Sequence, residues 1–324
     1  MRKLKRSVVL ILVMTTISGV TIGCGGGKFP VTQPPVTQPP VIQPPEITLL
    51  YPSPDGRQNV VGEGVVLTLK GYASNPLRYI EVFIENNKVA EAFPGGNSFE
   101  VDVTHFGTSK GEKEVLIKGT TTTNSVGECR LRIVYDEVLL DNLARDFLRR
   151  YSCIHEDGYR LVRFGNLHTG PYERPVRIYI WEELWNYREY IEKACNFWEK
   201  YTGIQFELIL KNPGEEPRPL IGIGGEFQEE SGIGAGTIVG TLESIYEITG
   251  GGITLYEKWL RTDQTTKIMV VAHELGHVLL CTAPGSPHTD DDSLMDANLG
   301  FRVLHCYQQR GARIMYRKAP GDKI

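Results

Sequence analysis

The segment His273-Glu274-Leu275-Gly276-His277 constrains this chain more than any other, because it is a complete H-E-x-x-H motif within a predicted helix. Histidines four residues apart lie one helical turn apart on the same face, so both imidazoles can reach one metal ion. The glutamate lies beside that face, where it can accept a proton from a water molecule at the metal. The motif therefore predicts a metal site with Glu274 as general base.

The flanking residues favour a helix around the motif. They include an apolar stripe at helical spacing: Ile268, Val271, Leu275, Val278 and Leu279. Thr265 or Thr266 is expected to cap the start of this helix. Pro284-Gly285 is expected to stop it. A chance occurrence of the motif is the simple alternative, and the residues that follow weigh against it.

A catalytic zinc ion usually has three protein ligands and one open position. No glutamate follows Glu274 in this sequence, so we do not expect a third ligand from a later glutamate. The remaining downstream donors are His288, His305, Asp290-Asp291-Asp292, Asp296, Cys281 and Cys306. His288 is the first histidine after a Pro-Gly pair that can turn the chain back toward the metal. A solvated loop histidine is the alternative interpretation of His288.

In order and residue type, His273, Glu274, His277, His288 and Met295 resemble the metzincin zinc peptidases, particularly their matrixin-like branch. The pattern of that family is H-E-x-x-H, a glycine, a third histidine and then a turn with a methionine beneath the metal. The resemblance covers residues 137–324. It implies a zinc ion held by His273, His277 and His288, with Met295 in the turn below.

The sequence departs from the family pattern after the second histidine. The family glycine falls at Leu280 and the third histidine at Ala283, and extra residues precede His288. Upstream, Gly234–Thr237 and Gly252–Leu255 resemble the strands that border the cleft of the family. A strand near Gly234–Thr241 is expected to pair with an extended substrate through its edge.

Residues 46–135 are predicted to form an all-β domain. Turn signals such as Asn86-Asn87 and Lys110-Gly111 separate short alternating apolar runs. These runs are 65–69, 80–84, 99–103, 115–117 and 131–133. The rhythm is typical of an immunoglobulin-like (Ig-like) sandwich and resembles bacterial surface modules of that type. No chemical motif lies in this stretch, so we expect a spacer or docking module.

Residues 136–324 are predicted to form an α+β domain. Helices are expected at 137–151 and 187–201, with alternating strands at 176–180 and 204–210. The apolar face of the first helix is predicted to contain Val138, Leu139, Leu143, Phe147 and Leu148. The predicted fold class is therefore multidomain, with an all-β Ig-like sandwich followed by an α+β metzincin-like zinc-peptidase domain.

The N-terminus is predicted to direct export. The basic stretch Met1–Arg6 precedes apolar and then small residues, as in a signal peptide over residues 1–23. Thr21-Ile22-Gly23-Cys24 resembles a bacterial lipoprotein box with Cys24 as the lipidated residue; the alternative is a plain secreted protein. Residues 24–45 form a Gly/Pro-rich linker. We expect a lipid-anchored protein of the bacterial cell envelope, at the outer membrane or cell surface.

The cysteines suggest disulfides. Of the six cysteines, five remain beyond Cys24, and an exported chain is expected to form disulfides. An odd number leaves at least one thiol outside any internal pair. Cys281 and Cys306 bracket the predicted metal loop and are the favoured pair, with Cys153 and Cys195 as the second choice.

The predicted function is a lipid-anchored, zinc-dependent endopeptidase that hydrolyses peptide bonds of a protein or peptide substrate. The net charge of −4 provides no basic footprint for nucleic acid, so the membrane, reached through the lipid, is the other expected partner. The rival is a non-enzymatic surface lipoprotein, an adhesin or binding module that retains the motif without turnover. Calcium could bind Asp290-Asp291-Asp292, but a solvated acidic loop is the favoured interpretation.

Overall fold

A computed structural model provides the structure of the chain. It describes residues 43–53, 59–155, 158–165, 174–209, 220–227, 235–244, 246–282, 288–289, 293–296 and 302–324. The chain divides into Met1–Ile42 and Gln43–Ile324, and the second unit holds every described residue. The predicted signal peptide, Cys24, most of the predicted linker and Asp290–Asp292 lie outside the described residues.

The first half of the described chain is a two-sheet β-sandwich. One sheet has the strand order β1-β3-β6, and the other has the order β2-β8-β7-β4-β5. The strands are β1 (Ile47–Tyr51), β2 (Val60–Val61), β3 (Leu67–Ala73), β4 (Leu77–Ile84), β5 (Asn87–Ala92), β6 (Ser98–Val103), β7 (Gly111–Thr121) and β8 (Val126–Tyr135). Each apolar run predicted from the sequence overlaps one of these strands, so the predicted all-β sandwich is confirmed.

Alternating side chains build the core of the sandwich. In β4, Ile80, Val82 and Ile84 are buried and the side chains between them are more exposed, because successive residues of a strand point to opposite faces. Leu69 of β3 and Ile117 of β7 join them in one buried apolar cluster. The cluster draws on both sheets, which is what holds a sandwich together.

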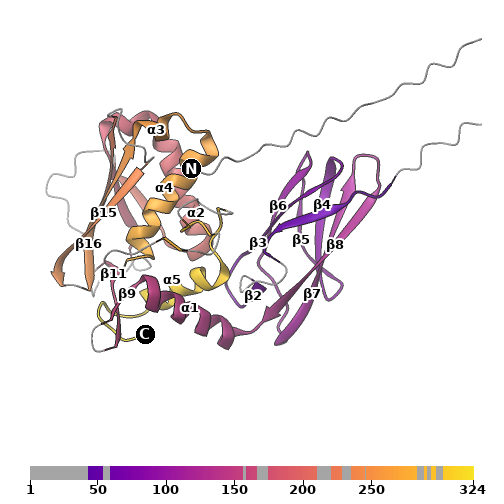
Figure 1. Ribbon diagram of the computed structural model, residues 1–324, viewed down its shortest axis with the longest axis horizontal. Coiled ribbons are helices and arrows are strands. Elements are labelled where there is room, and N and C mark those ends of the chain that lie inside the picture. Colours follow the sequence, from indigo (N-terminus) through magenta and orange to yellow (C-terminus); the bar gives the residue numbers. More distant parts are fainter. Residues whose placement is uncertain are drawn as a thin grey trace, which may run out of the picture. The chain divides into compact units, whose positions relative to one another are not determined.

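The second half of the described chain is built on a mixed six-stranded sheet (Figure 1). Its strands are β11 (Arg163–Phe164), β12 (Val176–Ile180), β13 (Phe206–Ile209), β14 (Leu220–Glu226), β15 (Ala235–Ser244) and β16 (Glu247–Tyr256). All its pairings are parallel except the antiparallel pairing of β15 with β16. Among the described strands β15 pairs with β16 alone, so β15 is an edge. A separate hairpin joins β9 (Cys153–His155) to β10 (Tyr159–Leu161).

Helices accompany this sheet in the second half of the described chain. They are α1 (Glu137–Tyr151), η2 (Glu182–Tyr187), α2 (Arg188–Thr202), α3 (Glu257–Leu260), α4 (Gln264–Leu279) and α5 (Cys306–Tyr316). Trp198 of α2 donates a 2.8 Å hydrogen bond from Nε1 to the carbonyl oxygen of Ala272 in α4. Trp198 and Leu275 share one buried cluster with sheet residues such as Ile223. None of the helices among the described residues combines the length and the apolar character that crossing a membrane requires.

The buried face of α1 differs from the predicted one. Leu140 and Ala144 are buried together with Phe147 and Leu148, whereas Val138 is 64% exposed. The first turn of the helix is held by Asp136, whose side chain accepts the backbone N–H groups of residues 138 and 139. The helix therefore presents the face that is centred on residues 140 and 144, and two apolar residues of its first turn remain outside.

The predicted disulfide between Cys281 and Cys306 is wrong. The five described cysteines are thiols, and the second-choice pair, Cys153 with Cys195, is not bonded either. Cys281 packs in the core around the mixed sheet, while Cys306 packs in the core of the sandwich. Cys281 and Cys306 lie on either side of the predicted metal loop in the sequence, but their side chains pack in different cores.

Candidate metal centre

Asp263 caps the start of α4. Its Oδ1 accepts the backbone N–H of Thr266 at 2.9 Å, and the Thr266 hydroxyl donates to Oδ2 at 2.6 Å. The predicted cap at Thr265 or Thr266 is therefore wrong, because Thr266 provides donors to the aspartate that precedes the helix. The helix ends at Leu279, before the predicted stop at Pro284-Gly285.

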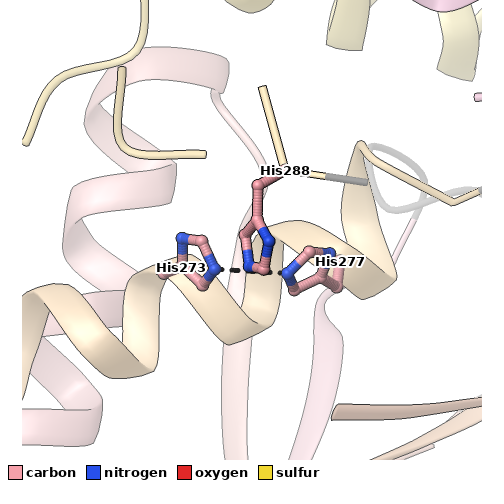
Figure 2. A group of neighbouring side chains, drawn as sticks. All are labelled: His273, His277 and His288. Carbon is pink, nitrogen blue, oxygen red and sulfur yellow. Dashed lines mark hydrogen bonds between the residues drawn. The ribbon is translucent and has the colours of Figure 1, made fainter. Parts of the chain in front are cut away.

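The inner side of α4 carries the H-E-x-x-H motif and faces a third histidine. The ring centroids of His273 lie 4.9 Å from those of both His277 and His288, and the last two are 5.1 Å apart. Figure 2 shows the two helical rings and the ring of His288, which comes from outside the helix, turned toward one another. Each ring offers a nitrogen within 4.8 Å of the other two. The structure thus brings together the three predicted ligands.

A backbone carbonyl orients His273. Its Nδ1 lies 2.7 Å from the carbonyl oxygen of Leu294 in a buried hydrogen bond. Because a carbonyl oxygen can only accept, Nδ1 carries the hydrogen and Nε2 retains its lone pair. That Nε2 is 3.2 Å from Nε2 of His277. His273 therefore presents an unprotonated nitrogen to the centre of the cluster.

A short turn at residues 293–296 supplies that carbonyl. The Ser293 hydroxyl accepts the backbone N–H of Met295 at 3.1 Å. The backbone N–H of Thr289, the residue after the third histidine, donates to the carbonyl oxygen of Met295 at 3.0 Å. Met295 is fully buried, and its sulfur lies so close to Gly276 that a Cβ on this glycine would overlap it. The turn therefore supports both α4 and the segment that bears His288.

The cluster fits a transition-metal ion. Zinc binds imidazole nitrogens tetrahedrally at roughly 2.0–2.1 Å, which separates two ligand nitrogens by about 3.3 Å. The Nε2 atoms of His273 and His277 are already 3.2 Å apart. Copper, iron and nickel also accept imidazole ligands, so the donor set defines the class of metal and leaves its identity open.

Burial keeps the imidazoles neutral. It lowers the pKa of His273, and it lowers the pKa of His277 to about 3, with the other two histidines adding to the effect. The pKa of His288 is lowered by burial and then by His273. Since the neutral imidazole is the form that binds metal, the cluster is ready to bind at neutral pH.

The carboxylate of Glu274 is held by Thr237 of the edge strand β15. The Thr237 hydroxyl lies 2.5 Å from Oε2 of Glu274, to which it donates, and 3.2 Å from the Glu274 carbonyl oxygen. Burial raises the pKa of Glu274, while the Thr237 hydrogen bond and then the electrostatic interaction with the His288 imidazole oppose the rise. The sequence analysis did not assign a role to Thr237. The one indication was that this residue lies in the strand expected to border the cleft.

The other candidate ligands lie apart from the cluster or outside the described residues. His305 is fully buried, and its Nδ1 forms a 2.6 Å hydrogen bond with the hydroxyl of Tyr51 in the sandwich. Cys306 is buried in the sandwich core. Asp296 is near enough to oppose the lowered pKa values of His273 and His288, but the cluster does not include it. The aspartates at 290–292 are not among the described residues.

No protein-family model matches this chain, and no curated protein sequence matches it. Among solved structures, the fibronectin(III)-like modules of CbhA from Clostridium thermocellum are 9% identical, with 28% of this chain and 94% of that chain covered and a TM-score of 0.22. A CARDB domain from Pyrococcus furiosus is 11% identical, with 28% and 90% covered and a TM-score of 0.19. CopC from Methylosinus trichosporium OB3b is 12% identical, with 28% and 94% covered and a TM-score of 0.19. Similarities this weak carry no argument about function.

Proposed function

We propose that this protein is a zinc-dependent endopeptidase. The observation that carries the proposal is the meeting of His288 with the two motif histidines, near enough to the carboxylate of Glu274 for His288 to interact with it electrostatically. Three neutral imidazoles with an adjacent carboxylate outside the ligand set are the parts that metal-assisted hydrolysis requires. The unprotonated Nε2 of His273 supports this assignment of the ligands.

The residues divide the chemistry between binding and proton transfer. His273, His277 and His288 would hold the zinc ion, which when bound supplies Lewis-acid polarisation of the scissile carbonyl. Glu274 accepts a proton from the attacking water and returns it to the leaving amine. Thr237 keeps the Glu274 carboxylate in one orientation during both transfers.

The edge strand β15 is the proposed place for the substrate. Its outer backbone edge pairs with no described strand, and an extended peptide can add to such an edge through main-chain hydrogen bonds. Thr237 lies in this strand and contacts Glu274, so a peptide on β15 would run past the base. Protein or peptide substrates in extended conformation are therefore the proposed class.

We assign the second half of the chain to the metzincins as part of this proposal. The support is the order of His273, Glu274, His277, His288 and Met295, together with the burial of Met295 beneath α4 at Gly276. The longer segment between the second and third histidines remains a departure from the family pattern. One ring nitrogen from each of His273, His277 and His288 still lies within 4.8 Å of the other two, in spite of that longer segment.

Elemental analysis of protein purified without added metal, combined with a peptide-cleavage assay, tests the proposal on one preparation. We expect about one zinc ion per chain. Glu274→Gln should keep the zinc and lose turnover by at least ~10²–10⁴-fold, the usual contribution of a general base. His288→Ala should lose both zinc and turnover, because one ligand of the set is gone.

His105→Ala is the matched histidine control, because His105 is exposed in the sandwich, and it should keep both zinc and activity. Zinc binding without cleavage of any member of a broad peptide library would favour the non-enzymatic surface lipoprotein. If His288→Ala kept its zinc while a change of His305 or Asp296 released it, the third ligand would have to be reassigned.

We also propose export and lipid anchoring at Cys24, on the strength of the sequence pattern over residues 1–24. Cells fed labelled fatty acid should incorporate the label into this protein, which should be found in the membrane fraction. Cys24→Ser should abolish the labelling and release the protein from that fraction. Undiminished labelling of Cys24→Ser would rule out this anchor.

A further inference from the structure

A buried hydrogen bond joins the sandwich to the start of α5. The hydroxyl of Tyr51, at the end of β1, lies 2.6 Å from Nδ1 of His305, the N-cap residue of α5. Tyr51 is 2% exposed and His305 is fully buried. Their rings stack with centroids 5.4 Å apart and planes inclined by 20°. The contact therefore combines ring packing with a desolvated hydrogen bond.

A side-chain amide adds a second link at the same place. Gln309 of α5 is fully buried. Its Nε2 donates to the carbonyl oxygen of Val66, and its Oε1 accepts the backbone N–H of Val66, both at 2.8 Å. Nε2 also donates to the carbonyl oxygen of Leu304 at 2.8 Å. The backbone of the sandwich next to β3 is thus fastened to the residues that open α5.

From α5 the contacts continue to the turn beneath the histidine cluster. Oε1 of Gln308 accepts the backbone N–H of His305 at 2.9 Å, and Nε2 of Gln308 donates to the hydroxyl of Ser293 at 2.9 Å. Ser293 begins the turn whose next residue, Leu294, accepts the Nδ1 hydrogen of His273. His305, Gln308 and Ser293 are all fully buried.

We infer that the β-sandwich is a positioning support for the candidate metal centre, with Tyr51 acting through His305, Gln308 and Ser293 on the turn that orients His273. This role goes beyond the spacer expected from the sequence. In a buried chain of hydrogen bonds each member restricts the orientation of the next, so the chain holds its members in one arrangement. The inference rests on the proposed function only for what the centre binds.

A second contact leads from the sandwich toward α4 by another route. The Thr68 hydroxyl of β3 shares a 2.8 Å hydrogen bond with the hydroxyl of Tyr201, near the end of α2. One turn earlier in α2, Trp198 donates to the carbonyl oxygen of Ala272, the residue before His273. The sandwich is therefore linked to both elements that adjoin the histidines: through α5 to the turn below them, and directly to α2, the helix beside α4.

The test is Tyr51→Phe in the full chain, which removes the hydroxyl and keeps the stacked ring. Amide hydrogen exchange is measured in metal-free protein on a peptide that spans residues 288–296. We expect exchange in this peptide to become about tenfold faster, the factor that corresponds to the loss of one buried hydrogen bond. Zinc affinity of the variant, measured by competition with a chromophoric chelator, should fall by a similar factor.

Tyr72→Phe is the matched control, because Tyr72 belongs to the same sandwich, in β3, and its side chain is 45% exposed. This variant should leave exchange and zinc affinity unchanged. Ser293→Ala, at the other end of the chain of contacts, should reproduce the faster exchange of residues 288–296. Circular dichroism confirms that each variant is folded.

Unchanged exchange of residues 288–296 in Tyr51→Phe, with faster exchange in Ser293→Ala, would overturn the inference, because the turn would then be held without the sandwich. The exchange measurement is made on metal-free protein, so its outcome does not depend on whether the protein binds zinc. A wild-type protein that binds no zinc would overturn the proposed function instead. The two failures are therefore distinguishable.

Discussion

At the scale of single residues, the hydroxyl of Thr237 and the carboxylate of Glu274 form the contact that most directly concerns the proposed proton transfer. Burial disfavours the ionised form of Glu274, and a donated hydrogen bond favours it. The balance of these two effects decides the pH at which the carboxylate is ready to accept a proton. A residue on the edge strand thus adjusts a base on the helix.

Thr237→Val removes this donor and keeps the shape of the side chain. The pKa of Glu274 should rise, because the hydrogen bond stabilises the carboxylate form, and the acid limb of the kcat/KM profile should move to higher pH. The plateau should fall by roughly 10- to 100-fold, since a hydrogen bond to a charged group contributes roughly 1.5–3 kcal/mol. Thr237→Ser retains the hydroxyl and should keep the wild-type profile. A Val variant with an unshifted acid limb would contradict this role.

The buried histidines predict how the stability of the metal-free protein depends on pH. The pKa values of His273 and His277 lie below the ordinary value near 6.5, in the case of His277 at about 3. Below about pH 6.5 the unfolded chain binds protons that the folded protein excludes, so the free energy of unfolding should fall as the pH falls. The slope is at most about 1.4 kcal/mol per pH unit for each histidine.

Urea unfolding of metal-free protein between pH 7 and about pH 4 measures this slope. His277→Gln should flatten the curve, because one depressed histidine pKa is gone. Glu274 acts in the opposite direction, since its raised pKa removes stability as the pH rises through that value. Stability that increases on acidification from pH 6.5 would show that the histidines are not held neutral by burial.

At the scale of elements, α4 and the turn at residues 293–296 are fitted together at Gly276. A Cβ on Gly276 would overlap the sulfur of Met295 and press against Trp198 of α2. Only a residue without a side chain allows the helix to approach the turn this closely. Gly276, the residue before the second histidine of the motif, therefore has a packing role in addition to its place between the ligands.

Gly276→Ala should destabilise the protein by about 1–3 kcal/mol, the usual effect of overpacking a core, and should weaken zinc binding because the turn must move. Thermal or urea unfolding and the chelator competition measure the two effects. Gly252→Ala in β16 is the matched control, since an added Cβ there meets no atom within 4 Å. Equal free energies of unfolding for the two variants would show that the close contact between Gly276 and Met295 does not limit the size of the residue at position 276.

The periodicity of apolar residues predicted which segments form helices and strands better than it predicted which face of each element is buried. The strands of the sandwich agree with the sequence pattern, and α2 lies within a residue at each end of the helix predicted at 187–201. The inner face of α1 does not agree, because the pattern counted Val138 and Leu139, which the capped first turn leaves exposed. Local spacing identifies which residues share a face, and the partner helix or sheet selects the face that is buried.

At the scale of the whole molecule, the cysteines should behave as thiols in two buried cores. Burial raises the pKa values of Cys153 and Cys306 to about 12, and Cys195 and Cys281 are buried as well. Among the five cysteines in the described part of the chain, only Cys129 is partly exposed. A thiol that is both buried and protonated reacts slowly with alkylating reagents.

Alkylation of native protein that begins at Gly25 should modify Cys129 first, and the other four thiols should react only after denaturation, without added reductant. Intact mass analysis counts the modified residues, and peptide mapping locates them. A form of the protein that reacted at fewer than the five described cysteines after denaturation would contain a disulfide. A linked Cys281–Cys306 peptide would restore the pairing predicted from the sequence.

The sequence by itself determined the features that depend on neighbours along the chain. Two histidines on one helical face with a glutamate beside them follow from spacing, and so do the alternating strands of residues 46–135. The sequence left the third metal ligand to be chosen among several downstream donors, of which His288 was one. Spacing along the chain does not determine where a loop returns to the metal site.

Only the tertiary structure decided which distant groups meet. It brought His288 to the motif histidines, enclosed His305 against Tyr51, placed Thr237 on Glu274 and left the favoured cysteine pair unbonded. These contacts join residues on separate elements, and their geometry follows from how sheets and helices pack. The physical reason is that covalent geometry limits only near neighbours, whereas burial selects among the many long-range pairings that the chain allows.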